Sequence, residues 1–84
     1  MSLEELRKVL NEKKVIFGSE RTLKMLKNGK LNAVYVASNC QTKIKEDIKY
    51  YAKLSNVNVI ELEQANDELG VICKKPFSIS VISY

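Results

Sequence analysis

Leucines recur at helical spacing in the first dozen residues. Leu3, Leu6 and Leu10 fall at i, i+3 and i+7, which places them on one apolar stripe of a helix. Ser2 and Glu5 form a capping-box pair, in which the hydroxyl and the carboxylate each accept a backbone N–H. The pattern predicts a first helix of about three turns.

A short apolar run and a glycine follow this helix. Residues 15–17 are β-forming and stop at Gly18, which indicates a short buried strand and then a sharp turn. Ser19 is a natural N-cap for a second helix, and Asn28–Gly29 marks the end of that helix.

The middle of the chain predicts a strand and then a long helix. Residues 33–37 are apolar throughout, as expected of a central strand that is covered on both faces. Ile44, Ile48, Tyr51 and Ala52 recur at i, i+4, i+7 and i+8, which is helical spacing. We expect this third helix to close near residues 54–56.

The last third of the chain predicts a strand, a short helix and a final strand. Residues 57–62 form the third strand, and a fourth helix covers about residues 64–69, with Gly70 as its C-cap. Residues 77–83 alternate, so we expect a strand with one wetter face. Its apolar positions are Phe77, Ile79 and Val81, and its polar positions are Ser78, Ser80 and Ser83.

The order of these elements, α-β-α-β-α-β-α-β, predicts the fold class. Alternating helices and strands favour an α/β layered sandwich around a four-stranded, parallel or mixed sheet. The chain has 84 residues, which allows one small domain, so residues 1–84 are expected to form a single domain.

The composition removes most catalytic functions. The chain contains no His and two Cys, so it has no Ser-His-Asp triad, no histidine base and too few soft ligands for a zinc site. We therefore expect a protein that is not an enzyme and that needs neither a cofactor nor a metal.

Targeting signals are not recognisable in the sequence. The apolar runs are far shorter than the roughly 20 residues that cross a bilayer, and the N-terminus does not resemble a signal peptide. We expect a cytoplasmic protein that contacts no membrane, in which Cys40 and Cys73 are free thiols.

Positive charge is concentrated in residues 13–30. This segment carries six basic residues against one acid, a net charge of +5, whereas the whole chain has a net charge of +4. Arg21, Lys24 and Lys27 repeat every three residues and form a basic stripe on the second helix. Such a stripe is either a solvated helix face or a surface for an anionic partner.

The junction between the first strand and the second helix favours the second interpretation. A glycine there lets an external backbone approach closely, and the free N–H groups at a helix start attract phosphate. Gly18 and Ser19 nevertheless also fit a simple turn and cap, because the junction is neither a P-loop nor a dinucleotide-binding fingerprint.

Two other segments have alternative interpretations. Residues 68–73 place apolar side chains around Gly70, so they form either an exposed loop that receives an unstacked base or a set of core residues. Lys45, Lys49 and Lys53 are spaced at i, i+4 and are interpreted as a solvated helix face.

Four runs of residues together resemble a known family. The sequence resembles the e-type family thirty of large-subunit ribosomal proteins from archaea and eukaryotes, within the superfamily of kink-turn RNA-binding ribosomal proteins. The resemblance covers nearly the whole chain and is carried by residues 18–24, 36–39, 46–55 and 66–70. It implies a three-layer α-β-α sandwich with a four-stranded mixed sheet.

The resemblance also implies a ligand. A kink-turn consists of two RNA stems bent about an internal loop with tandem sheared G·A pairs and one extruded nucleotide. Carried over by position, the RNA-binding residues are Gly18 and Ser19 at the helix start, Glu20 and Arg21 at the G·A edges, Lys24 and Lys27 at phosphates, Asn39 at a base or ribose, and Val71, Ile72 and Phe77 near the extruded nucleotide.

The chain departs from the family pattern at two places. Glu20–Arg21 stands where many relatives carry Asn followed by Glu or Gln, and Cys73–Lys74 stands where many have a second glycine. Cys40 and Cys73 are expected on neighbouring loops of the RNA-facing edge, where oxidation would hinder binding.

The resemblance therefore implies a structural constituent of the large ribosomal subunit, cytoplasmic and monomeric when free. Its partners are a kink-turn in ribosomal RNA and neighbouring ribosomal proteins. Two alternatives stay open: a free-standing kink-turn binder that acts on guide RNA or messenger RNA, and a small α/β protein-interaction module.

Overall fold

A computed structural model describes residues 2–12 and 14–84 of the chain, with side chains from Glu4 onward apart from residue 13. The predicted Ser2–Glu5 capping box, the stripe position Leu3 and the basic residue Lys13 therefore lie outside the described side chains. Helices and strands alternate in the predicted order. They are α1 (Ser2–Glu12), β1 (Ile16–Phe17), α2 (Ser19–Lys27), β2 (Ala33–Val36), α3 (Thr42–Leu54), β3 (Asn58–Glu61), α4 (Asn66–Ile72) and β4 (Val81–Ser83).

The four strands form one mixed sheet in the order β1-β4-β2-β3. β2 and β3 are parallel, and Val34 lies opposite Val59. β4 runs antiparallel to both of its neighbours, with Ile82 opposite Phe17 on one side and Tyr35 on the other. The last strand of the sequence is therefore a central strand, and β1 is an edge strand with half-buried side chains, which corrects the expectation of a buried β1.

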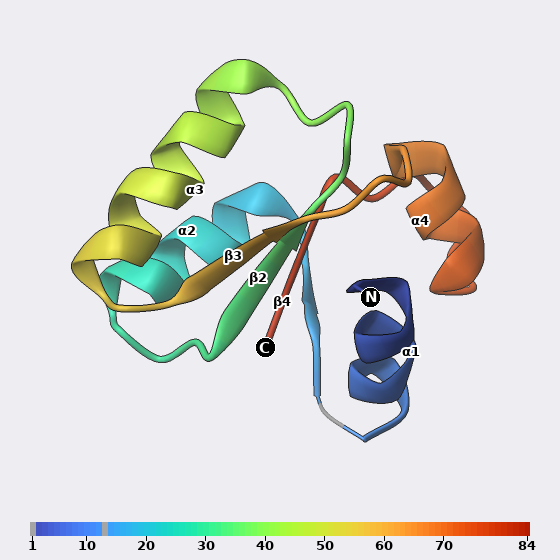
Figure 1. The fold of residues 1–84 in the computed structure, drawn as a ribbon, viewed down its shortest axis with the longest axis horizontal. Helices are drawn as coiled ribbons and strands as arrows, with labels where there is room; N and C mark the ends of the chain where they lie inside the picture. The colour runs from blue at the N-terminus through green and yellow to red at the C-terminus, as the bar shows by residue number, and fades with distance from the viewer. Residues whose placement is uncertain (1, 13) are drawn as a thin grey trace.

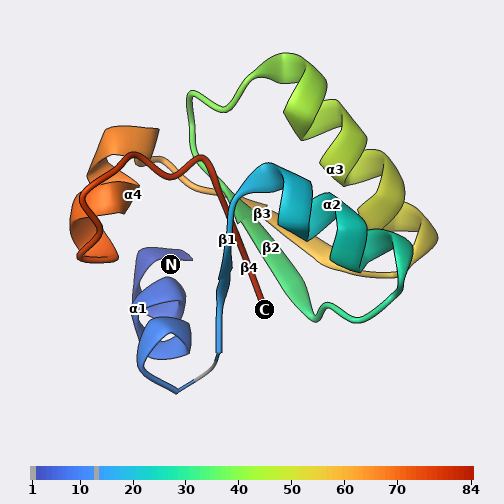
Figure 2. The same cartoon turned by 180° about the vertical axis from the view of Figure 1, so that it is seen from behind.

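Helices cover both faces of the sheet, which confirms the three-layer sandwich (Figures 1 and 2). On one face, α2 and α3 pack with Leu26 and Ile48 against Val36 and Val81. On the other face, α1 and α4 contribute Leu6 and Leu69 to a second cluster, which also contains Tyr35 of β2, Ile82 of β4 and Ile79 from the chain before β4. All four residues of β2 are buried, as their uniformly apolar character predicts.

The expectation of a wetter face on the last strand is wrong. Ser83 is fully buried, and its hydroxyl lies 2.8 Å from that of Thr22 on α2, which is also fully buried. Ser83 shares its face with Val81 because side chains two residues apart in a strand point the same way. Ile79 packs on the opposite side of the sheet from Val81, because the regular strand begins only at Val81.

Two predicted helix ends are also wrong. Gly18, not Ser19, is the N-cap of α2, and none of the described side chains caps this helix. α4 continues through Gly70 to Ile72. The glycine is required by packing and not by the helix end, because a Cβ there would collide with the carbonyl oxygen of Phe77.

Three helices end in the same backbone motif. After α2, α3 and α4, the next residue but one is left-handed, at Gly29 (φ 67°), Asn56 (φ 55°) and Lys74 (φ 58°). Each helix end is closed by two nested backbone hydrogen bonds, the Schellman motif. For α4, Lys74 N–H donates to Val71 O and Lys75 N–H donates to Gly70 O. Glycine adopts this conformation freely, asparagine tolerates it, and lysine is strained in it.

The Lys74 backbone generates a prediction about stability. Replacing Lys74 with Gly should stabilise the protein by about 1 kcal/mol relative to Lys74→Ala, since both variants lose the charge but only glycine relieves the left-handed strain. Urea unfolding followed by circular dichroism measures the difference. Equal stability of the two variants would contradict the strained helix end.

The buried Thr22–Ser83 pair generates a second prediction. Ser83→Ala leaves the Thr22 hydroxyl without its partner and should cost about 1–3 kcal/mol of unfolding free energy, and Thr22→Val should act similarly. The double variant should cost clearly less than the sum, because no buried hydroxyl then lacks a partner. Additive costs in urea unfolding would show that the two hydroxyls do not depend on each other.

Candidate nucleic-acid interface

The parallel strands β1, β2 and β3 all end at one edge of the sheet, at its upper end in Figure 1. The segments that meet there are the start of α2, the loop after β2, the start of α4 and the chain that enters β4. Backbone hydrogen bonds tie these segments together: Gly18 N to Val81 O (3.0 Å), Ala37 N to Ser80 O (2.8 Å), Ser38 N to Gln64 O (2.9 Å) and Ile79 N to Asn66 O (3.0 Å).

Gly18 directs the chain from β1 straight into α2. Its backbone has φ 110° and ψ 150°, which a residue with a side chain rarely adopts. A Cβ built on Gly18 would meet nothing within 4 Å, so the space in front of this glycine is open. No described side chain caps α2, so the N–H groups of its first turn are free to donate to a ligand, and Glu20 and Arg21 are exposed. The arrangement suits an anion.

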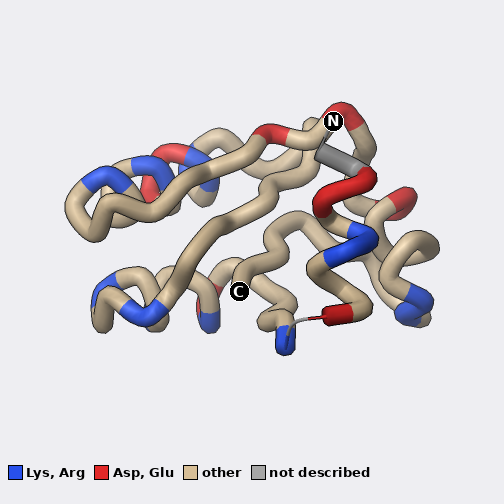
Figure 3. Tube along the Cα trace, turned by 60° about the horizontal axis from the view of Figure 1, so that its bottom comes forward, with Lys and Arg blue, Asp and Glu red and all other residues tan. Residues whose placement is uncertain are grey.

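Arg21 and Lys24 line a groove beside the edge strand. Lys14, from the segment before β1, lines the same groove with Ile16 and Met25 at its base. These basic residues thus come from two segments that the fold brings together, and basic positions predominate along the lower margin of Figure 3. Three residues of the predicted basic segment, Lys14, Arg21 and Lys24, therefore lie together along this groove.

Lys27 lies apart from this groove. Its ammonium is 5.0 Å from the centre of the Tyr51 ring, on α3, so the side chain leans toward the second helix of the layer. The three-residue repeat that predicted one stripe of Arg21, Lys24 and Lys27 therefore separates into two surfaces. The cause is that a cation is attracted to the face of an aromatic ring.

Asn39 is held by another asparagine. Its side-chain oxygen accepts the backbone N–H of Asn66 at 2.9 Å, and its amide donates to the Asn66 side-chain oxygen at 3.0 Å. Asn39 thereby caps the start of α4 from 27 residues away. Sequence reasoning assigned a role to Asn39 and missed Asn66, because no local pattern links two asparagines so far apart.

Val71 and Ile72 lie on a groove between α1, β1 and the end of α4. Val71 is 77% exposed, and Ile72 is partly buried against the core. The groove has a volume of about 690 Å³ and also contains three basic side chains, of which sequence reasoning singled out only Lys74, as a departure from the family pattern. Its principal lining residues are Arg7, Phe17, Val71, Ile72, Lys74 and Lys75.

Phe77, unlike Val71 and Ile72, is not among the residues that line this groove. It is 54% exposed and precedes Ile79, whose N–H donates to the Asn66 carbonyl. The interpretation of Leu69, Val71 and Ile72 as core is correct for Leu69, which is fully buried, holds in part for Ile72, and is wrong for Val71, which is exposed.

The lysine ladder on α3 is not simply solvated. Lys45 and Lys49 both contact the Glu61 carboxylate on β3, at 3.0 and 3.2 Å. Hydrogen bonds from Lys45 and then Lys49 lower the pKa of Glu61 below its usual value. Only Lys53, the third member of the ladder, has no ion pair among the described side chains.

The expected neighbourhood of the two cysteines is wrong. Cys40 is buried in the core between the sheet and the α2–α3 layer, whereas Cys73 packs against the cluster on the opposite face. Both thiols are free, and burial raises the pKa of each. Since oxidation proceeds through the thiolate, neither site favours the redox effect that the sequence raised.

Two further findings limit what this surface contains. Across residues 2–12 and 14–84, no group of three or more His, Cys, Asp and Glu side chains is placed to hold a metal ion. Within the same ranges, no helix has the length and apolar character needed to span a membrane.

Comparison with known proteins identifies the family. The model of the ribosomal protein L7Ae/L30e/S12e/Gadd45 family matches residues 2–84. The chain belongs to this family, on its eL30 branch. The large ribosomal subunit protein eL30 of Sulfurisphaera tokodaii is 46% identical over 78 residues, which cover 93% of this chain and 74% of that protein. The eL30 protein of Saccharolobus solfataricus is 47% identical over 79 residues, which cover 94% and 73%.

A third eL30 protein and one solved structure are also similar to this chain. The eL30 protein of Methanocaldococcus jannaschii is 42% identical over 77 residues, which cover 92% of this chain and 70% of that protein. A solved structure of a protein with unknown function from Bacillus halodurans C has a TM-score of 0.82 over 96% of this chain and 80% of that chain, at 20% identity. This last likeness shows the fold alone.

The Asn39–Asn66 contact generates a prediction within this eL30 fold. Asn39→Ala removes the acceptor for the Asn66 N–H, so exchange of that amide hydrogen should accelerate about fivefold or more, as expected when a bond worth about 1 kcal/mol is lost. Asn39→Asp keeps an oxygen at the same place and should retain most of the protection. Hydrogen exchange followed by NMR measures both, and unchanged exchange in Asn39→Ala would contradict the tertiary cap.

Proposed function

We propose that the chain is a non-catalytic, structural constituent of the large ribosomal subunit that binds a kink-turn in ribosomal RNA. The observation that carries this proposal is the open, uncapped start of α2 beside a basic groove, in a chain that is more than 40% identical to eL30 proteins. Its partners are ribosomal RNA and neighbouring ribosomal proteins, and it works on the cytoplasmic ribosome as a monomer that docks on RNA.

The start of α2 enters the RNA bend in this proposal. Gly18 lets the RNA backbone approach, because the space in front of it is open, and the uncapped N–H groups of the first turn of α2 donate to the RNA. Ser19 begins the helix, and Glu20 and Arg21 face the edges of the sheared G·A pairs. A carboxylate accepts guanine N–H groups, and a guanidinium donates to base edges or phosphate.

Lys24 neutralises phosphates crowded at the bend, and Lys14 supports it from the other wall of the same groove. Lys27 acts on phosphates farther along the RNA, because its side chain leans on Tyr51 at the far end of α2. Proteins bind the RNA backbone chiefly through such cations, and binding therefore weakens as salt competes.

The loops that follow β2 and α4 complete the proposed interface. Asn39 retains one amide hydrogen and one lone pair for a base or ribose after its two bonds to Asn66. Phe77 and Val71 offer exposed apolar surface to the extruded nucleotide, and Ile72 supports it from a half-buried position. Recognition of splayed bases by such surfaces is typical of RNA-binding proteins.

The names of the relatives support this function over the two alternatives. The proteins that match most of the chain are large ribosomal subunit proteins, which favours a ribosomal site over a free-standing kink-turn binder. The same names favour RNA binding over a protein-interaction module.

A binding experiment tests the proposal. The chain should bind a kink-turn RNA far more tightly than a matched RNA whose sheared G·A pairs are replaced by Watson–Crick pairs. If it contacts about five phosphates, affinity should fall roughly several-hundredfold between about 50 and 200 mM salt. Filter binding measures both effects, and equal affinity for the two RNAs would overturn the kink-turn proposal.

Charge reversal in the same assay locates the interface. Lys24→Glu should weaken kink-turn binding roughly tenfold or more, because it replaces a phosphate contact with repulsion. Lys30→Glu is the matched control, since this exposed lysine follows the other end of α2. Equal losses in the two variants would indicate general electrostatic attraction instead of a located site.

A further inference from the structure

The C-terminal half of α3 exposes two large apolar side chains that the fold does not use. In residues 50–55, Tyr51 packs against the core, Ala52 is buried, and the Ser55 hydroxyl donates to the Leu26 carbonyl at 2.8 Å. Tyr50 and Leu54, by contrast, are 61% and 66% exposed, and lie one turn apart on the helix. Packing in the core therefore does not explain why these two positions carry large apolar side chains.

The Tyr50 ring is held in place although it is exposed. It contacts the Tyr51 ring edge-to-face, with centroids 5.1 Å apart and an angle of 81° between the rings. Lys27 lies over the Tyr51 ring and holds that ring in turn. An aromatic ring that is positioned in advance loses little conformational entropy when a partner binds it.

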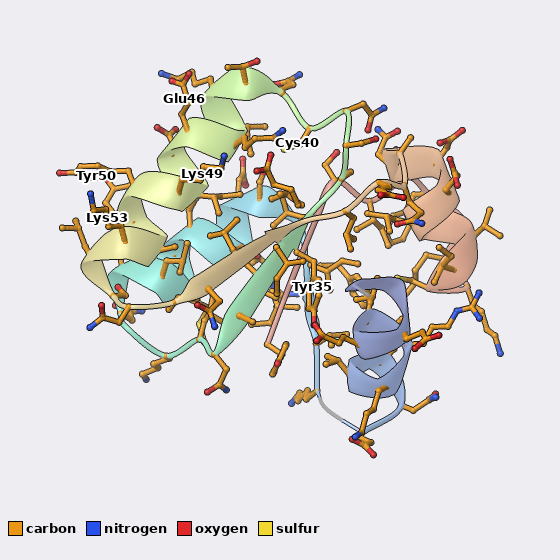
Figure 4. The ribbon with its side chains drawn as sticks, viewed as in Figure 1. Tyr35, Cys40, Glu46, Lys49, Tyr50 and Lys53 are labelled. Carbon is orange, nitrogen blue, oxygen red and sulfur yellow. The ribbon has the colours of Figure 1, made fainter. Side chains whose placement is uncertain are left out.

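Basic side chains lie on the C-terminal side of Tyr50. Lys53 lies between Tyr50 and Leu54 along the helix and is exposed, and Lys27 approaches from α2. The acids Glu46 and Asp47 lie one turn before Tyr50 on the same helix. Glu61, an exposed acid on β3, is already engaged by Lys45 and Lys49. In Figure 4, Tyr50 and Lys53 project from the outer side of α3, away from α1 and α4, and Glu46 lies one turn of the helix before Tyr50.

We propose that Tyr50, Lys53 and Leu54, together with Lys27, form a second RNA-contact surface, the α3 patch, which binds a single-stranded or looped stretch of ribosomal RNA outside the kink-turn. An unpaired base stacks on Tyr50 and against Leu54, and the two lysines contact the flanking phosphates. Exposed aromatics among basic residues are how proteins bind unpaired strands. This inference rests on the proposed function, because it takes ribosomal RNA as the partner.

Charge favours RNA over a protein as the occupant. Lysines are depleted in protein–protein interfaces, whereas phosphate contacts need them. The patch also lies too far from the start of α2 for one RNA base to contact both. Lys27, the patch residue on α2, follows Ser19 at the start of that helix by eight residues, or about 12 Å of helix. The two surfaces therefore bind two separate stretches of RNA.

The test compares two RNAs with the full chain. One is an isolated kink-turn hairpin, and the other is the large-subunit RNA domain that contains it. The variant Tyr50→Ala/Lys53→Glu should bind the hairpin within about twofold of the natural chain but should bind the longer RNA roughly tenfold more weakly, as expected for the loss of one stacked base. Tyr50→Phe keeps the ring and should bind both RNAs normally, and Lys8→Glu, on α1, is the charge control.

Photo-crosslinking identifies the partner directly. Trypsin cuts after Lys49 and Lys53, so residues 50–53 form one peptide, which should carry a crosslinked nucleotide after irradiation of the complex with the longer RNA. Equal loss of affinity for both RNAs, no loss for either, or a crosslink from this peptide to a ribosomal protein would each overturn the α3 patch. If the affinity of the chain for the hairpin did not depend on the sheared G·A pairs, the proposed function itself would be overturned, so the two outcomes are distinguishable.

Discussion

The insertion of β4 between β1 and β2 is the constraint on which the rest of the structure depends. β4 is the last strand of the chain, and it pairs antiparallel with both neighbours. Its burial places Val81 and Ile82 in opposite core clusters and brings Ser83 against Thr22 at the base of α2. The same insertion places Gly18 and Ala37 beside the chain that enters β4. The candidate interface is therefore assembled by long-range pairing, and its segments cannot form in isolation.

The charge distribution follows from the same topology. Because β1 is pushed to the edge, Lys14 and the outer face of α2 line one groove, and Arg7, Lys74 and Lys75 line another on the opposite face. Positive charge thus surrounds the β1 edge, whereas the β3 edge carries Glu61 paired with lysines of α3. Six of the 14 basic residues thereby line the two grooves that flank β1.

Local patterns predicted the order of all eight elements, because apolar periodicity reports directly which face of a helix or strand is buried. They misjudged the serines of the last strand, because polarity indicated solvent where Ser83 finds a buried hydroxyl partner. They also predicted that α4 ends at Gly70, because the sequence does not distinguish a glycine needed for close packing from a glycine that ends a helix. In the candidate site, the start of α2 was predictable from Gly18 and its neighbours, whereas the Asn39–Asn66 contact was not.

The sequence by itself determined the element types, the concentration of basic residues and the membership of the eL30 branch, because each is carried by neighbouring or regularly spaced residues. Only the tertiary structure decided that β4 lies inside the sheet, that Lys27 contacts the Tyr51 ring instead of the groove beside Arg21, and that Tyr50 is exposed while Tyr51 packs against the core. These outcomes depend on contacts between residues far apart in the chain, whose energies local periodicity does not encode.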